Sequence, residues 1–262
     1  MTAFADLLVP PVTKAVVTLG TRPHVTLSFL LLTPQYPMAS VILLPGGHGN
    51  LELNKSLVAR GNNFLIRTRE AFGNQGFQVA VIDAPSDRKP AGMRSGFRQS
   101  GEHVADIEAV AHYLRKRVNV PVWLIGTSRG TESAAYVAIR CRETIAGLVL
   151  TSAISESKRK GGGVTRMQLE SLKIPVLIVA HREDACELTP ASGAERIKNA
   201  LVKSPRAETV YFEGGVPPRS KPCEGLSAHG FFGIEREVVD AIAAFIKSNI
   251  RLPRRKHPAE RV

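Results

Sequence analysis

Residues 126–130 read Gly-Thr-Ser-Arg-Gly, which fits the spacing Gly-x-Ser-x-Gly. The motif follows the apolar run 122–125 and precedes a stretch with helical periodicity, so we expect it at a sharp turn from a strand into a helix. Such a turn strains the backbone and exposes the serine hydroxyl, and the glycines avoid collisions with the neighbouring strand and helix. Ser128 is therefore the candidate nucleophile, and the backbone N–H of Arg129 is a candidate oxyanion donor.

This motif in this context resembles the nucleophile turn of the α/β-hydrolase family. The resemblance spans the chain from about Val25 to Ile250. It implies a serine hydrolase in which an acid and then a histidine follow the serine along the chain, each shortly after a strand.

The resemblance implies an acid after the apolar run 174–180, where the chain continues His-Arg-Glu-Asp. We predict Asp184 as the acid, with Glu183 as the alternative. Its role would be to accept the N–H of the histidine and to stabilise the imidazolium that forms during attack. A purely structural interpretation, an acid at a helix entry near Thr189, stays open.

The same resemblance implies a histidine before the last helix, and His229 follows the apolar run 209–212. There it would take the proton of the serine and return it to the leaving group. His181 is the main rival, but it precedes Asp184 and so reverses the expected order. The other five histidines are weaker candidates by position: His24, His48, His103, His112 and His257.

The second oxyanion donor is expected in the loop after the apolar run 41–44, where residues 45–49 read Pro-Gly-Gly-His-Gly. Glycines let the main chain approach a bound acyl group closely. Gly47 falls where the family donates its N–H, and His48 is the alternative because Pro45 replaces the histidine that begins this loop in many relatives. The loop lacks the Lys-Ser or Lys-Thr of a phosphate-binding motif.

Three cysteines are too few for a disulfide scaffold. Cys186 follows Asp184 and Cys223 precedes His229, so a bridge between them forms only if the two loops converge; whether it does stays open. Cys141 is expected as a buried thiol. Without a visible signal peptide the default compartment is the cytoplasm, whereas a removed signal together with a Cys186–Cys223 bridge would indicate the periplasm or secretion.

Apolar runs alternate with helical patterns along the chain, which predicts the α/β class: an α/β-hydrolase fold whose mostly parallel sheet of about eight strands has helices on both faces. Residues 1–250 are expected to form one domain. The first two strands should form a hairpin at one edge. Strands are expected at 15–19, 25–32, 40–44, 77–82, 120–125, 146–150, 174–180 and 208–212, and helices at 62–72, 102–118, 130–142, 189–202 and 234–250.

Two segments differ in composition from the rest. A short insert at about 155–172 contains Lys-Arg-Lys-Gly-Gly-Gly at 158–163 and is interpreted as either a mobile flap or an ordinary surface loop. The basic tail 251–262 is interpreted as a solvated terminus.

Composition excludes several classes of protein. The chain has 262 residues, 44% of them hydrophobic and 22% charged, so it is neither disordered nor fibrous. No apolar run is long enough to span a membrane. The net charge of +12 predicts attraction to anions, and basic residues near the cleft suggest an anionic acyl substrate.

The sequence thus predicts a serine hydrolase that cleaves a carboxylic ester of a small or medium acyl substrate through an acyl-enzyme, with no metal or organic cofactor. A lactone, thioester or peptide substrate is the alternative within this chemistry. A non-catalytic binding protein for an anionic partner is the alternative from another class, although no specific nucleic-acid motif is present. The oligomeric state stays open.

Overall fold

The computed structural model describes residues 12–53, 61–89, 91–156 and 163–250. The predicted basic tail 251–262 and the Lys-Arg-Lys-Gly-Gly segment 158–162 lie outside the described residues, as does His257.

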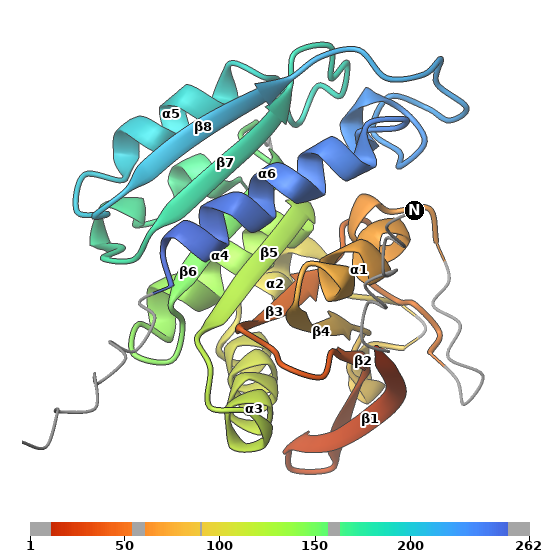
Figure 1. Ribbon diagram of the computed structural model, residues 1–262, viewed down its shortest axis with the longest axis vertical. Helices are drawn as coiled ribbons and strands as arrows, with labels where there is room; N and C mark the ends of the chain where they lie inside the picture. Colours follow the sequence, from red (N-terminus) through yellow and green to blue (C-terminus); the bar gives the residue numbers. More distant parts are fainter. Residues whose placement is uncertain (1–11, 54–60, 90, 157–162, 251–262) are drawn as a thin grey trace, which may run out of the picture.

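A single eight-stranded sheet forms the centre of the molecule, in the order β1-β2-β4-β3-β5-β6-β7-β8 (Figure 1). The first two strands form an antiparallel hairpin at one edge, β2 pairs antiparallel with β4, and the strands from β4 to β8 are parallel. The strands are β1 (Thr13–Arg22), β2 (Val25–Thr33), β3 (Ala39–Leu44), β4 (Phe77–Ile82), β5 (Val122–Ser128), β6 (Gly147–Ala153), β7 (Val176–His181) and β8 (Ala207–Phe212).

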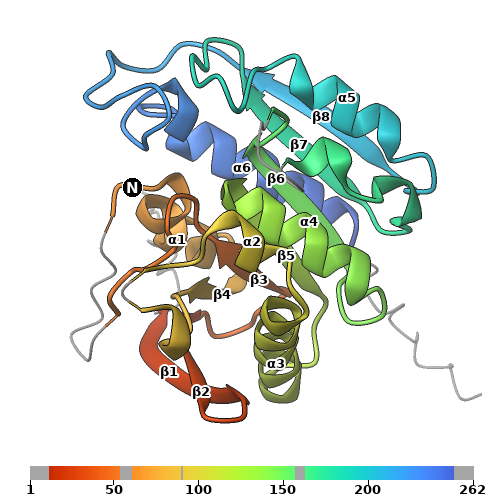
Figure 2. The same ribbon diagram turned by 180° about the vertical axis from the view of Figure 1, so that it is seen from behind.

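Helices cover both faces of this sheet. On the face nearest the viewer in Figure 1 lie α1 (Phe64–Asn74) and α6 (Glu235–Ser248). On the opposite face, seen in Figure 2, lie α3 (Gly101–Arg117), α4 (Gly130–Arg140) and α5 (Gly193–Ala200). The shorter helices are α2 (Ser95–Arg98), η1 (Ser86–Arg88), η2 (Val164–Arg166), η3 (Leu169–Ser171) and η4 (Ala228–Gly230).

The two faces carry separate hydrophobic cores. One core packs α3, α4 and α5 against the sheet, and the other packs α1 and α6. Every residue of β3, β4, β6 and β7 is buried, as expected for parallel strands covered on both sides. The one polar pair inside β3 and β4 is only partly satisfied: the hydroxyl of Ser40 donates to Oε1 of Gln78 at 2.9 Å, whereas Nε2 of Gln78 is buried without a hydrogen-bond partner among the described residues.

The strand order reverses direction at β3. This strand lies between β4 and β5, so the chain leaves it toward one side and later returns on the other. In parallel sheets the loops at the carboxyl ends of two such strands separate, and a crevice for ligands forms between them. Here those loops are residues 45–49 after β3 and the turn at Ser128 after β5.

The eight predicted strands and five predicted helices are present in the predicted order along the chain with different boundaries, whereas α2 and the 3-10 helices were not predicted. The helix predicted at 189–202 begins only at Gly193, because the hydroxyl of Thr189 bonds Asp184 and the carbonyl of Pro190 accepts from the N–H of Gly193 in a turn. The strand predicted at 120–125 extends through Ser128.

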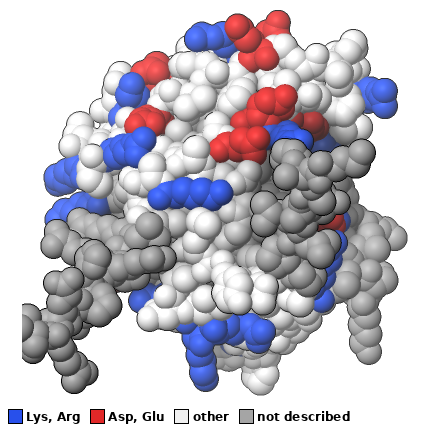
Figure 3. Space-filling model, in the orientation of Figure 1, with Lys and Arg blue, Asp and Glu red and all other residues white. Residues whose placement is uncertain are grey.

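Charged side chains are dispersed over the face shown in Figure 3. Lysine and arginine lie at many positions there, separated by uncharged and acidic side chains. Within the described ranges, no helix is long and apolar enough to cross a membrane.

Candidate active site

Ser128 occupies a strained turn between β5 and α4. Its φ is +52°, a left-handed conformation that a residue with a Cβ rarely adopts and that clusters at functional sites. The flanking glycines are sterically required: a Cβ on Gly126 would lie 2.4 Å from the carbonyl oxygen of Gly130, and a Cβ on Gly130 would lie 1.8 Å from that of Leu44. The turn predicted from Gly-x-Ser-x-Gly is therefore present, and close backbone packing fixes it.

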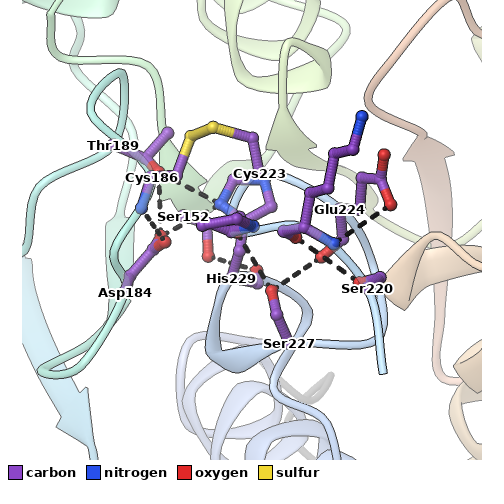
Figure 4. The surroundings of a disulfide bond; sticks show 11 residues. Ser152, Asp184, Cys186, Thr189, Ser220, Cys223, Glu224, Ser227 and His229 are labelled. Carbon is purple, nitrogen blue, oxygen red and sulfur yellow. Dashed lines mark hydrogen bonds and ion pairs between the residues drawn. A yellow bond between two sulfur atoms is a disulfide. The ribbon is translucent and has the colours of Figure 1, made fainter. Parts of the chain in front are cut away.

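Asp184 and His229 come from distant loops and meet at one end of the sheet. Nδ1 of His229 lies 3.0 Å from Oδ2 of Asp184, with 5% of the histidine side chain and 1% of the aspartate side chain exposed. The hydroxyl of Thr189 lies 2.8 Å from the same carboxylate oxygen and 3.1 Å from Nδ1. The other oxygen of Asp184 accepts the backbone N–H of Cys186 at 3.0 Å. The side chains of Asp184, Thr189 and His229 converge in Figure 4.

A disulfide joins these two loops. Cys186 and Cys223 are bonded with their Cα atoms 4.7 Å apart, across a sequence separation of 37. The bridge left open by the sequence is thus present, and it lies beside the Asp184–His229 pair (Figure 4). Cys141 is a buried free thiol, as predicted, and burial raises its pKa to about 11.

Two side chains from other parts of the chain donate hydrogen bonds to backbone carbonyls of the loop that carries His229. The hydroxyl of Ser152, which has a φ of +42° at the end of β6, donates to the carbonyl of His229 at 2.8 Å. The guanidinium of Arg67 donates to the carbonyls of Gly225 at 2.6 Å and Gly230 at 2.9 Å. Neither residue belongs to a sequence motif, so sequence reasoning missed both.

Ser128 and His229 line the same small cavity of about 40 Å³, together with Gly47, Asn63 and Gly230. No hydrogen bond joins the serine hydroxyl to the histidine in the described part of the chain, and catalytic hydrogen bonds are often long before substrate binds. A larger cavity of about 400 Å³ shares Gly47 and Asn63 as lining residues.

The loop 45–49 borders both cavities. Gly47 has a φ of +62° and lines the small cavity beside Ser128, whereas His48 is exposed and lines only the larger one. Of the two predicted oxyanion donors in this loop, Gly47 is therefore the one that borders the same cavity as the serine.

The side chain of Arg98 binds the loop 45–49 from the protein interior, and sequence reasoning also missed this residue. It is fully buried, and its guanidinium donates to the carbonyls of Pro45 at 3.0 Å, Gly47 at 3.3 Å and Met93 at 3.0 Å, and to the hydroxyl of Ser133 at 2.8 Å. Burial lowers the pKa of Arg98 to about 10, so it stays charged at neutral pH. The positive charge therefore lies directly behind the loop 45–49 and beside the helix α4 that follows Ser128.

The alternative acid and histidine candidates have other hydrogen-bond partners or are exposed. Nε2 of His181 lies 3.0 Å from the carbonyl oxygen of Gly214, and its Nδ1 accepts the N–H of Glu183 at 3.1 Å. Glu183 itself is exposed. His24 and His112 are also exposed, while His103 is buried in α3 with neither ring nitrogen hydrogen-bonded.

Comparison with known proteins agrees with this fold. A family model described as serine aminopeptidase, S33, matches residues 63–182. The fold is similar to that of a lid-free α/β serine hydrolase from Xanthomonas campestris, with 15% identity, a TM-score of 0.63 and coverage of 93% of this chain and 98% of that one. It is also similar to an α/β serine hydrolase homologue from Coxiella burnetii, with 20% identity, a TM-score of 0.60 and coverage of 87% and 95%.

A third similar structure is Est1E from Butyrivibrio proteoclasticus, with 15% identity, a TM-score of 0.60 and coverage of 90% of this chain and 98% of that one. No curated protein matches the sequence. The sheet order and the similar structures together show an α/β-hydrolase fold, and the matching family model, described as serine aminopeptidase, covers its residues 63–182.

Proposed function

We propose that this protein is a serine hydrolase that cleaves a carboxylic ester through an acyl-enzyme at Ser128. One observation carries the proposal: Ser128, at a strained turn, lines the same cavity as His229, whose Nδ1 lies 3.0 Å from the carboxylate of Asp184. This is the arrangement of nucleophile, base and orienting acid that activates a serine.

The proposed mechanism assigns one role to each group. Because Asp184 accepts the Nδ1 proton of His229, Nε2 is left to take the proton of Ser128 as the hydroxyl oxygen attacks the carbonyl carbon. The backbone N–H groups of Arg129 and Gly47 would stabilise the oxyanion. His229 then returns the proton to the leaving alcohol, and water releases the acyl group by the same steps.

The larger cavity supports a small or medium substrate. Its volume is about 400 Å³, and its wall combines the apolar side chains of Leu51 and Ile66 with neutral polar groups. Among the described residues that line it, Glu224 is acidic and none is lysine or arginine. Among the described residues of this wall, the anionic substrate suggested by net charge therefore finds no cation, and we propose a neutral acyl substrate instead.

A peptide bond is the second candidate, because the matching family model is that of a serine aminopeptidase. Glu224 lines the larger cavity and is the carboxylate there that would suit a substrate ammonium group. Aminoacyl p-nitroanilides and their N-acetylated forms would distinguish the two candidates: faster release from the free-amine series than from any ester would favour the peptidase.

The test is ester turnover in a p-nitrophenyl series of increasing acyl length, with Ser128→Ala, Asp184→Asn and His229→Gln compared with wild type. We expect an initial burst of one p-nitrophenol per wild-type chain and a loss of about 10⁴-fold or more in kcat in each variant. Ser171→Ala, in η3 and outside both cavities, is the matched control and should keep wild-type turnover. Equal turnover by wild type and Ser128→Ala would refute the proposal and favour a non-catalytic binding protein.

A further inference from the structure

Asn63 lies immediately before α1 and caps it. Its backbone is extended, and its side-chain Oδ1 accepts the N–H of Leu65 at 3.1 Å. Because only the oxygen of an amide side chain can accept this bond, the contact also fixes which end of the side chain is the NH₂ group. The Nδ2 donor therefore points away from the helix.

Nδ2 of Asn63 reaches the nucleophile turn through the space that Gly46 leaves empty. A Cβ on Gly46 would lie 3.2 Å from this nitrogen and 2.9 Å from Cβ of Ser128, so both groups border one point that only glycine leaves free. Asn63 also lines the small cavity with Ser128 and His229. Within the described ranges, Nδ2 has no hydrogen-bond partner of its own.

The backbone at Asn63 is tightly packed on the side of the histidine loop. A Cβ on Gly225 would lie 1.9 Å from the carbonyl oxygen of Asn62 and 3.1 Å from the backbone nitrogen of Asn63. Arg67 donates both to that carbonyl of Asn62 and to the carbonyl of Gly225. The amide donor is consequently preorganised, which is the property that makes a hydrogen bond effective in a transition state.

We propose that Nδ2 of Asn63 is a third oxyanion donor, a side-chain N–H that acts beside the backbone N–H groups of Arg129 and Gly47. The inference rests on the proposed function and extends it. Nδ2 of Asn63 lies next to Gly46, which belongs to the loop 45–49 that we expect to contribute the second backbone donor. This position favours the oxyanion, and not the leaving group, as the acceptor of the Asn63 hydrogen bond. Asn63 donates a hydrogen bond and transfers no proton, so His229 still carries out every proton transfer of the reaction.

The test separates donation from capping by two substitutions that both keep a capping oxygen. Asn63→Ser retains an N-cap acceptor, and its shorter side chain has no N–H group at the position of Nδ2. Asn63→Asp is nearly isosteric but presents an acceptor in place of NH₂. We expect kcat for p-nitrophenyl esters to fall about 10²-fold in Asn63→Ser and further in Asn63→Asp, with KM changed less than about threefold. The melting temperature should stay within a few degrees of wild type because the cap remains.

The matched control is Asn119→Asp, the same charge change at an exposed residue between α3 and β5, which should keep wild-type kcat. If wild type shows Ser128-dependent turnover and both Asn63 variants keep kcat within threefold, the third donor is refuted while the proposed function stands. If wild type shows no Ser128-dependent turnover, the proposed function fails and this inference fails with it. A fall in kcat at nearly unchanged KM that is accompanied by a large decrease in melting temperature would also refute the donor role, since it would indicate structural damage.

Discussion

The two halves of the candidate site differ in that only one of them contains a covalent cross-link between its loops in the described part of the chain. The nucleophile half consists of the turn at Ser128 and the loop 45–49, and close backbone packing shapes it. The acid–histidine half consists of the loops that carry Asp184 and His229. Its backbone is also closely packed at Gly225 and Gly230, and the Cys186–Cys223 bridge and long-range side-chain contacts join its loops.

This difference predicts how each half fails. The turn at Ser128 has no space for a side chain at its glycine positions, so one added methyl group should displace the nucleophile. Loops joined by a cross-link and by separate hydrogen bonds can lose one contact and keep the others. We therefore expect the nucleophile half to be lost abruptly and the acid–histidine half to be weakened in steps.

Gly130→Ala should have the largest effect. The new Cβ would lie 1.8 Å from the carbonyl oxygen of Leu44, so the turn must separate from the loop after β3. We expect a loss of about 4 kcal/mol or more in the free energy of unfolding and at least about a 10²-fold fall in ester turnover, measured by urea denaturation and initial rates.

The matched control for that substitution is Gly101→Ala. A Cβ on Gly101, at the start of α3, meets no atom within 4 Å, so this variant should be as stable as wild type or more stable. If the two alanine variants behaved alike, the rigid character of the nucleophile half would be disproved.

Removing the disulfide should have the next largest effect. For a sequence separation of 37, the chain-entropy treatment gives a stability loss of about 4 kcal/mol for the Cys186→Ala/Cys223→Ala double variant. Because the turn at Ser128 does not depend on the bridge, a fluorophosphonate should still label Ser128, more slowly than in wild type. Cys141→Ala, which keeps the bridge, is the control.

A thiol count checks the bridge itself. Unfolded wild type without reductant should titrate one thiol, that of Cys141. Three titratable thiols would show that the bridge is absent, and the two halves of the site would then not differ by a cross-link.

Arg98→Met tests the support behind the oxyanion loop. The substitution leaves the buried carbonyl of Pro45 and the partly buried carbonyl of Gly47 without their donor, which should cost about 3 kcal/mol and lower kcat more than it raises KM. Arg98→Lys should recover only part of kcat, because a single ammonium cannot reach every acceptor of the planar guanidinium. Unchanged kcat in the methionine variant would show that the loop does not need this contact.

His103 belongs to neither half and should affect stability alone. Burial lowers its pKa to about 3 from an ordinary 6.5, so between these values the unfolded chain binds a proton that the folded chain does not. The free energy of unfolding should therefore fall as pH decreases below about 6.5, by about 1.4 kcal/mol per pH unit from this group.

His103→Leu removes that dependence along with two unpaired ring nitrogens. At pH 7 we expect a gain of about 1 kcal/mol in the free energy of unfolding, and at pH 5 the gain should be about 2 kcal/mol larger. A constant difference between pH 7 and pH 5, measured by urea denaturation, would show that His103 titrates normally in the folded protein.

The sequence predicts the two halves unequally for the same physical reason. The turn at Ser128 is visible because its cause is local: glycines at fixed offsets between an apolar strand and a helix. The strands and their order along the chain are visible for a similar reason, since buried parallel strands are short continuous apolar runs, whereas their order in the sheet was not predicted.

The contacts made by Arg98, Arg67 and Ser152 join residues far apart in the chain, and no spacing rule predicts them. The disulfide depended on convergence of two loops, which the sequence left open. Asn63 fell inside the helix predicted at 62–72, whereas the structure makes it the residue that caps α1, and only its approach to Gly46 connects it to the site.

The most direct test of the account is labelling with a fluorophosphonate, with the adduct located by mass spectrometry in wild type, Ser128→Ala and His229→Ala. Such a probe reacts with a serine only when a base and an oxyanion hole activate it. The account predicts one adduct, on Ser128, in wild type and none in either variant. A folded wild-type protein that stays unlabelled, or a label on another serine, would contradict the claim that the two halves meet to activate Ser128.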